Sequence, residues 1–82
     1  MIDPVASERA EHFGWTKETG SVAAANRNRT IFTDGSSFYS VDTQHGRFEV
    51  TDLRGVHQRE INFDGAQTKP ADPSGGHNLR VK

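Results

Sequence analysis

Two carboxylates and an imidazole lie within the stretch DTQHGRFE, residues 42–49. Asp42 and Glu49 stand at its ends, and His45 lies between them. A carboxylate can remove a proton from a substrate and an imidazole can supply one, so these residue types can perform general acid–base catalysis when they face one another. Asp, His, Gln and Gly are also common in exposed turns, and by spacing alone a solvated hairpin is the more ordinary interpretation.

The alternation of apolar and polar residues indicates how these groups would be positioned. Residues 37–42 and 47–52 have the pattern of two strands joined by a turn at 43–46. In the second strand Phe48 is expected in the core, which leaves Glu49 pointing away from the core. The aspartate ends the first strand and the histidine lies in the turn, so all three groups could converge on one surface.

The whole sequence predicts a small α+β domain that is mostly β. Turn residues recur about every ten residues, which is typical of an antiparallel meander. An aspartate followed by proline and then by Ala, Glu and Arg predicts a short N-terminal helix. We expect this helix to pack on a twisted antiparallel sheet of about four strands, followed by an irregular C-terminal tail. The expected elements are a helix at 3–12, a connection at 16–26, strands at 29–33, 37–42, 47–52 and 56–63, and a tail at 64–82.

Length and composition limit the classes of protein to which the chain can belong. Its 82 residues predict a single domain, 1–82. No apolar run approaches the roughly 20 residues of a membrane-spanning helix, so we expect no membrane segment. The first residues do not resemble a signal peptide, so we expect export to depend on elements outside this chain. A net charge of −1 gives no strong basic field for nucleic acid, although a local basic face could form.

A carboxylate base, an imidazole acid and a nearby guanidinium suit the cleavage of RNA by its own 2′-hydroxyl. The base removes the 2′-proton, the 2′-oxygen attacks the adjacent phosphorus, and the acid protonates the departing 5′-oxygen. A cation stabilises the charge that gathers on the phosphoryl oxygens. His57 and Arg59, on the next predicted strand, could reach this surface. Such a reaction needs no metal or other cofactor, and the 2′-hydroxyl makes it specific for RNA.

Two longer segments carry a resemblance to a known family. FYSVDTQHGRFEV and the later RGVHQREINFDGAQTKPADP resemble the C-terminal killing domain of the ribosomal-RNA-cleaving colicins, of the colicin E-three and cloacin type. In that family an aromatic-rich strand runs into Asp-x-Gln-His-Gly-x-x-Glu. A Gly-x-His strand, a turn containing Asp and Gly, and a Lys-x-x-Asp-Pro segment follow. The likeness covers residues 37–73 and keeps this order throughout.

The resemblance implies a metal-independent endoribonuclease toxin that cuts small-subunit ribosomal RNA at the decoding centre and stops translation. By position, Glu49 would be the general base, His45 the general acid, and Asp42 the residue that orients the histidine. His57 matches a second family histidine, used for RNA contact or positioning. The resemblance also implies the ribosome as target, a cognate immunity protein as inhibitor, and action in the cytoplasm of a target bacterium after secretion or delivery. We expect the domain to be a monomer.

The chain departs from the family pattern in three respects. The family carries a catalytic arginine shortly after its Asp-Pro, where this chain has Ser74-Gly75-Gly76-His77, and Arg80 is the candidate replacement. Thr51 stands where family domains carry an aromatic residue. The family domains are also strongly basic, which this chain is not.

Other residues are candidates for contact with RNA. Tyr39 could stack on a base, and Lys69 and His77 could reach phosphate. Arg27 and Arg29 could also touch phosphate, or they could flank an edge strand as charges that prevent aggregation. The predicted RNA-binding set is Tyr39, His57, Arg59, Lys69 and His77.

Two other classes of function remain open at this stage. The domain could be a non-catalytic RNA- or protein-binding β module that keeps the same scaffold. It could also be a metal-dependent DNase that uses its histidines, although no pair of histidines has the spacing of a zinc site.

Overall fold

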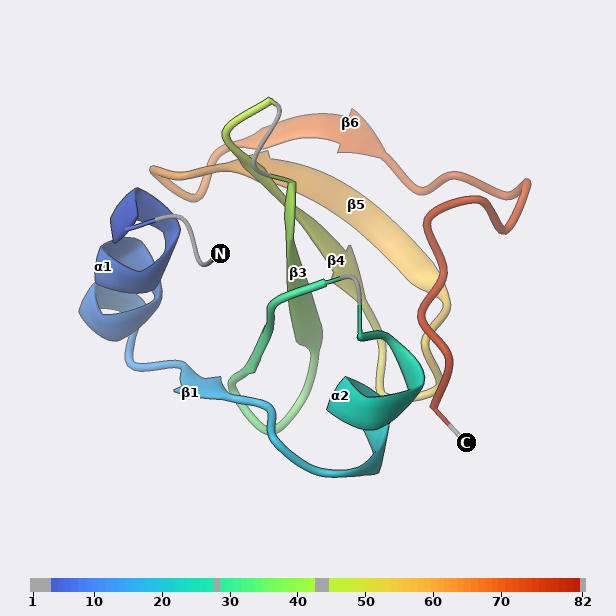
Figure 1. Ribbon diagram of the computed structural model, residues 1–82. Coiled ribbons are helices and arrows are strands. Elements are labelled where there is room, and N and C mark those ends of the chain that lie inside the picture. Colours follow the sequence, from blue (N-terminus) through green and yellow to red (C-terminus); the bar gives the residue numbers. More distant parts are fainter. Residues whose placement is uncertain (1–3, 28, 43–44, 82) are drawn as a thin grey trace.

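The computed structural model of the chain describes residues 4–27, 29–42 and 45–81. Within these residues one antiparallel sheet holds six strands, which follow one another in sequence order (Figure 1). The predicted α+β, mostly β fold with a short N-terminal helix is confirmed. The elements are α1 (Pro4–Phe13), β1 (Thr16–Lys17), α2 (Ser21–Ala25), β2 (Ile31–Thr33), β3 (Phe38–Asp42), β4 (Arg47–Thr51), β5 (His57–Asn62) and β6 (Gln67–Pro70).

The sequence pattern misses three short elements, so the sheet has more strands than the four expected. β1 and α2 occupy residues 16–26, which have the pattern of a connection. The two residues of β1 are too few to show a periodicity, and pairing with β2 alone makes them a strand. β6 lies in the segment predicted to be irregular, and every residue of it is exposed, so no apolar alternation marks it. As an edge strand it also tolerates Pro70.

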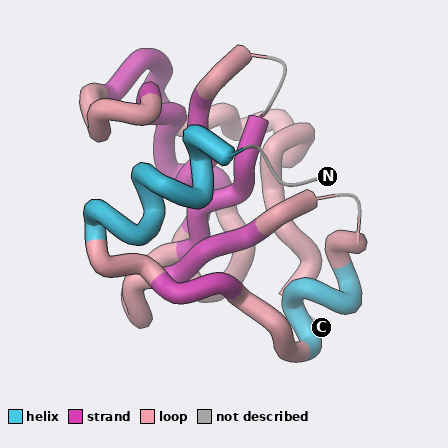
Figure 2. The backbone as a smooth tube through the Cα atoms, turned by 60° about the vertical axis from the view of Figure 1, so that its left-hand side comes forward, coloured by secondary structure: helices cyan, strands magenta, loops and turns pink. Residues whose placement is uncertain are grey.

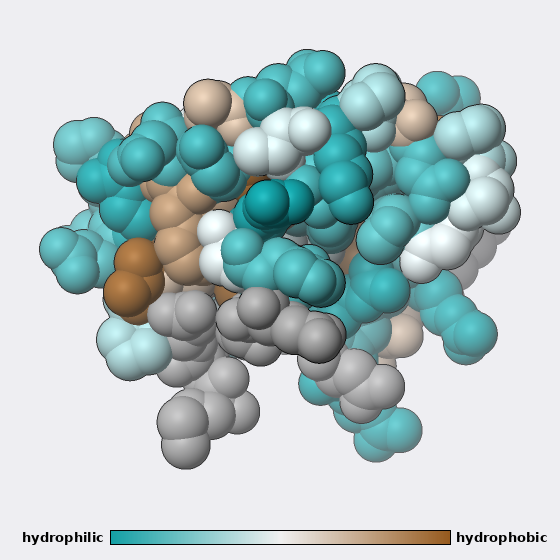
Figure 3. All heavy atoms as spheres, turned by 90° about the horizontal axis from the view of Figure 1, so that it is seen from above, coloured by the Kyte–Doolittle hydropathy of each residue, from teal (hydrophilic) through white to brown (hydrophobic). Residues whose placement is uncertain are grey.

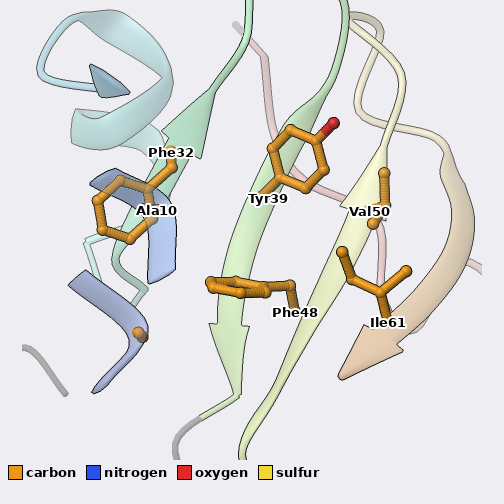
Figure 4. Close-up of a cluster of buried hydrophobic side chains, with 7 residues drawn as sticks. Ala10, Phe32, Tyr39, Phe48, Val50 and Ile61 are labelled. Atoms are coloured by element: carbon orange, nitrogen blue, oxygen red, sulfur yellow. The ribbon is translucent and has the colours of Figure 1, made fainter. Parts of the chain in front are cut away.

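The helix α1 covers one face of the sheet and builds the larger core (Figure 2). Ala6 and Ala10 are almost completely buried, and their small side chains let α1 lie close to the strands. Against them the sheet presents large apolar residues that lose nearly all their contact with water. Figure 4 shows these side chains meeting between α1 and the strands: Phe32, Tyr39, Phe48, Val50 and Ile61.

A second, smaller core lies on the opposite face of the sheet. Side chains alternate along a strand, so Ile31 and Phe38 face away from α1. They pack against Val22 of α2 and against Leu79 of the C-terminal segment. The segment after β6 therefore belongs to the folded domain, and it closes one end of this face.

Gly55 fixes where that C-terminal segment docks. Its φ is +84°, and a Cβ built on it would collide with the carbonyl oxygen of Leu79. The backbone N–H of Leu79 donates to the Gly55 carbonyl at 2.8 Å. Only glycine permits both this conformation and this close approach.

Beyond the second core, the same face of the sheet becomes polar. Ser40 of β3 pairs with Glu49 of β4, and Glu49 pairs with Glu60 of β5. Ser40, Glu49 and Glu60 are all buried, although each carries a polar side chain. A row of buried polar groups across three central strands requires hydrogen-bonding partners, and those partners define the candidate site.

The face of the molecule that Figure 3 shows is predominantly polar. The face in Figure 3 consists mostly of hydrophilic residues, and hydrophobic ones form only small patches there. Among the residues that the structure describes, neither helix has the length and apolar character needed to cross a membrane.

The docking of the C-terminal segment can be tested by comparing two glycines. Gly55→Ala should destabilise the domain by about 1–3 kcal/mol beyond the backbone cost, because the new methyl group overpacks against Leu79. Gly35 is the matched control, since it also has a positive φ, +92°, but open space around it. Gly35→Ala should carry only the backbone cost of about 1–2 kcal/mol. Urea unfolding measures both, and equal losses would contradict the close approach at Gly55.

Candidate active site

Glu49 lies at the centre of the candidate site. Its strand, β4, is flanked by β3 and β5, and its side chain is only 7% exposed. One carboxylate oxygen of Glu49, one of Asp42 and one of Glu60 all lie within 4.8 Å of one another. Three acidic groups this close repel one another unless protons or cations compensate, so their partners determine their ionisation.

Glu60 is held in the ionised form by its partners. Its Oε1 accepts hydrogen bonds from Arg47 Nη1 at 2.9 Å and from Thr68 Oγ1 at 2.6 Å. Burial alone would raise the pKa of Glu60, but the hydrogen bonds from Thr68, Glu49 and Arg47 together lower this pKa to about 2. The negative charge of Glu60 therefore faces Glu49 across the strand pair at every physiological pH.

Glu49 is shifted in the opposite direction. Burial, and then the hydrogen bond and the negative charge of Glu60, raise the pKa of Glu49 above its usual value. The hydrogen bond from His57 and the proximity of His77 act against this rise without cancelling it. A carboxylate whose pKa is raised is a better proton acceptor than an ordinary surface carboxylate.

His57 holds the Glu49 carboxylate in place. The backbone N–H of Asp72 donates to His57 Nδ1 at 2.8 Å, so Nδ1 is an acceptor and Nε2 carries the proton. That Nε2–H donates to Glu49 Oε1, also at 2.8 Å. The His57 side chain is only 2% exposed, so it can hold Glu49 in place but is too buried to contact RNA directly.

His45 reaches the same side of the sheet through Asp42. Its Nδ1 lies 2.8 Å from Asp42 Oδ2, and its backbone N–H donates to Oδ1 at 3.2 Å. The carboxylate of Asp42 is in turn one of the three that cluster with Glu49. With Nδ1 engaged, Nε2 is the atom of this 60% exposed ring that can deliver a proton.

Two clefts open onto Glu49, and His77 lines both of them. His77 Nδ1 lies 4.0 Å from Glu49 Oε2, and its Nε2 lies 3.6 Å from Asp72 Oδ2. The first cleft, of about 180 Å³, is bordered by Arg29 and Asp42. The second, of about 220 Å³, is bordered by Lys69 and Asp72 together with the buried His57 and Glu60. Glu49 is thus largely buried, but it lines two clefts.

The structure places two predicted RNA-binding residues elsewhere. Tyr39 is part of the core under α1, where its ring stacks on Trp15 with centroids 3.7 Å apart. Its hydroxyl donates to Asp34 at 2.7 Å, and burial with this hydrogen bond raises the pKa of Tyr39 to about 12. Arg59 pairs with Val50 and so lies on the α1 face, opposite Glu49. Neither residue is available to RNA at the Glu49 clefts.

Arg80 does not line either cleft at Glu49, so the geometry does not support it as the catalytic arginine. The arginine that borders the cleft with Asp42 and Glu49 is Arg29. The sequence contains a signal that Arg29 lies near Asp42. Ile31 pairs with Ser40, and extending this antiparallel pairing by two residues brings Arg29 opposite Asp42. That register becomes visible only when the hairpin is aligned residue by residue.

The carboxylates of Asp42, Glu49 and Glu60 are also the groups that could hold a metal ion. Hard divalent cations prefer carboxylate oxygens, and these oxygens are close enough to share one. Glu60 is already bonded to Arg47 and Thr68, and Glu49 to His57. A cation would have to compete with these protein partners, so the observed contacts favour proton transfer as the chemistry of the cluster.

Comparisons of this chain with models of protein families, with curated proteins and with solved structures find no match. The function must therefore be argued from the site itself. It offers a buried carboxylate with a raised pKa, an exposed imidazole oriented by a second carboxylate, and an arginine that lines the same cleft.

The raised pKa of Glu49 makes a prediction about stability. Between the unfolded and folded pKa values the native state binds the extra proton, so this contribution to stability is lost as pH rises through the folded value. Glu49→Gln keeps an acceptor for His57 but has no proton to lose. We expect the variant to be more stable than the parent protein at pH 8, with the advantage disappearing at pH 4. Urea unfolding at both pH values measures this, and a difference independent of pH would contradict it.

Proposed function

We propose that this domain is a toxin ribonuclease of the colicin E-three and cloacin type, which cleaves small-subunit ribosomal RNA without a metal ion and blocks translation. The proposal rests on one observation above all. The buried Glu49, with its raised pKa, and the His45–Asp42 pair meet on one accessible face of the sheet. This is the pair of groups that attack by a 2′-hydroxyl requires.

In the proposed reaction Glu49 accepts the proton of the 2′-hydroxyl as the 2′-oxygen attacks the neighbouring phosphorus. The bond from phosphorus to the 5′-oxygen breaks, and protonated His45 donates the Nε2 proton to that oxygen. The products are a 2′,3′-cyclic phosphate and a free 5′-hydroxyl. Asp42 keeps the His45 ring oriented through Nδ1 and stabilises its positive charge.

Two neighbours adjust Glu49 for this task. The Nε2–H of His57 holds Oε1, which leaves Oε2, near His77, as the oxygen that can receive the substrate proton. Glu60 raises the proton affinity of Glu49 by its constant negative charge. Both groups act through Glu49 and do not need to touch the substrate.

The charge that develops on the phosphoryl oxygens requires a cation. Arg29 borders the cleft beside Asp42 and Glu49, and His77 borders both clefts. We assign this electrostatic role to Arg29 in place of Arg80. A donor of this kind contributes on the order of 10²–10³-fold to the rate.

The proposal implies that the protein shares the other properties of such toxins. The maker of the enzyme would need a tightly bound immunity protein, and the enzyme would act in the cytoplasm of the target bacterium after delivery into it. The small net charge of −1 gives weak attraction to bulk RNA, so recognition would depend on the local surface around the site.

Cleavage of intact bacterial ribosomes tests the proposal directly. Incubation in excess EDTA should release one discrete fragment of the small-subunit RNA, with a 2′,3′-cyclic phosphate end. Glu49→Gln should slow this cleavage by about 10²–10⁴-fold, because the general base is lost. Glu11→Gln, at an exposed position of α1, is the matched control and should cleave at the parental rate.

Each contrary result identifies a different alternative. Loss of cleavage in EDTA would point to a metal-dependent nuclease that uses the carboxylate cluster. Unchanged cleavage by Glu49→Gln would remove Glu49 from the role of base. Binding of RNA without any cleavage would identify a non-catalytic RNA-binding module.

The pH dependence of cleavage tests the coupling between the two glutamates. The rate should follow a bell, rising as Glu49 loses its proton and falling as the acid loses its own. Burial is the largest cause of the raised pKa of Glu49 and stays in Glu60→Gln, but this variant removes the negative charge that adds to it, so the acidic limb should move to lower pH. The position of the limb is the quantity to measure, because reduced folding would change only the amplitude. An acidic limb that stays in place would show that Glu60 does not tune the base.

A further inference from the structure

We propose that three arginines form a binding site for the phosphate backbone of the RNA strand, next to the catalytic cleft. The site is a cleft of about 380 Å³ lined by Ala25, Asn26, Arg27, Arg29, Asn78 and Arg80. This volume lies within the range of roughly 300–1,000 Å³ typical of ligand sites. The inference rests on the proposed function for its choice of RNA as the ligand.

The cleft gathers three arginines, and the residues that line it include no acid. In the part of the chain that the structure describes, no carboxylate lies within ion-pair distance of Arg27, Arg29 or Arg80. Guanidinium groups placed together repel one another, so an arrangement of this kind favours an anionic ligand. Arginine also suits phosphate, because its planar fork of donors can bind two oxygens at once.

The cleft is built by a specific set of hydrogen bonds. Asn26 holds the backbone of Arg80 from both sides: its Nδ2 donates to the Arg80 carbonyl at 2.6 Å, and its Oδ1 accepts the Arg80 N–H at 3.0 Å. The carbonyl of Asn26 also accepts the N–H of Arg29 at 2.9 Å. One asparagine therefore brings together arginines that lie far apart in the sequence, and it does so through their backbones and not through their side chains.

Arg29 connects this arginine cleft to the catalytic one. It lines the arginine cleft with Arg27 and Arg80, and it lines the neighbouring cleft with Asp42 and Glu49. A strand whose scissile phosphate lies at Glu49 would pass Arg29 and place its next phosphates near the other two arginines. This local positive track would provide the electrostatic attraction that the net charge of −1 does not.

Binding of single-stranded RNA by an inactive protein tests the site apart from catalysis. In the Glu49→Gln background, Arg27→Gln with Arg80→Gln should weaken binding about tenfold, and the salt dependence should fall by about 0.7 for each lost contact. Lys17→Gln with Arg54→Gln is the matched control, because it removes the same charge elsewhere on the surface. The control pair should bind almost as the parent does. Fluorescence anisotropy at several salt concentrations, with thermal unfolding to verify folding, gives both quantities.

The outcomes separate this inference from the proposed function. If ribosomes are cleaved but the two double variants bind RNA equally, the arginine cleft is excluded while the ribonuclease assignment stands. If ribosomes are not cleaved but the Arg27/Arg80 double variant alone binds RNA more weakly, the arginine cleft is supported as an RNA-binding site and the ribonuclease assignment fails. If polyglutamate competes as well as RNA of the same charge, the cleft binds an acidic protein and the RNA assignment is overturned.

Discussion

The buried carboxylate of Glu49 is the constraint on which the rest of the structure depends. A charge placed on the central strand of a small sheet is unfavourable unless other groups bond to it. His57 supplies a hydrogen bond to one oxygen, and the main chain at Asp72 fixes the tautomer that makes this bond. Glu60, itself held by Arg47 and Thr68, keeps the proton affinity of Glu49 high. Because this arrangement costs stability when Glu49 is ionised, it does not serve stability, and it fits the proton transfer that we propose.

The two faces of the sheet have different roles. On the α1 face the alanines of the helix and the aromatic residues of the strands form a conventional apolar core, which supports the sheet. On the other face a second, smaller core forms only because α2 and the C-terminal segment fold back over Ile31 and Phe38. That return also brings His77 to Glu49 and Arg80 to Asn26. The clefts at Glu49 and the arginine cleft are therefore both products of how the C-terminal segment docks.

The sequence predicts those parts of the fold that local patterns encode. The helix near 3–12 and the strands near 37–42, 47–52 and 56–63 follow from capping, turn residues and alternation, and the structure has them within one or two residues. β1 and β6 could not be predicted, because their pairing partners and not their own residues make them strands. The RNA contacts predicted for Tyr39 and Arg59 fail for a related reason. Those contacts were predicted from residue type, but strand register puts both residues on the α1 face.

The sequence by itself determined that Asp42, His45 and Glu49 belong to one hairpin, since a turn of few residues and a period of two leave little freedom to their side chains. Only the tertiary structure decided which groups complete the site. Glu60 and His57 come from β5, Arg29 from the start of β2, and His77 from the segment that returns over the sheet. The ionisation of Glu49 depends on burial and on these neighbours, and both are set by contacts between residues distant in sequence. No local pattern encodes such contacts, because they arise only when the separate elements pack together.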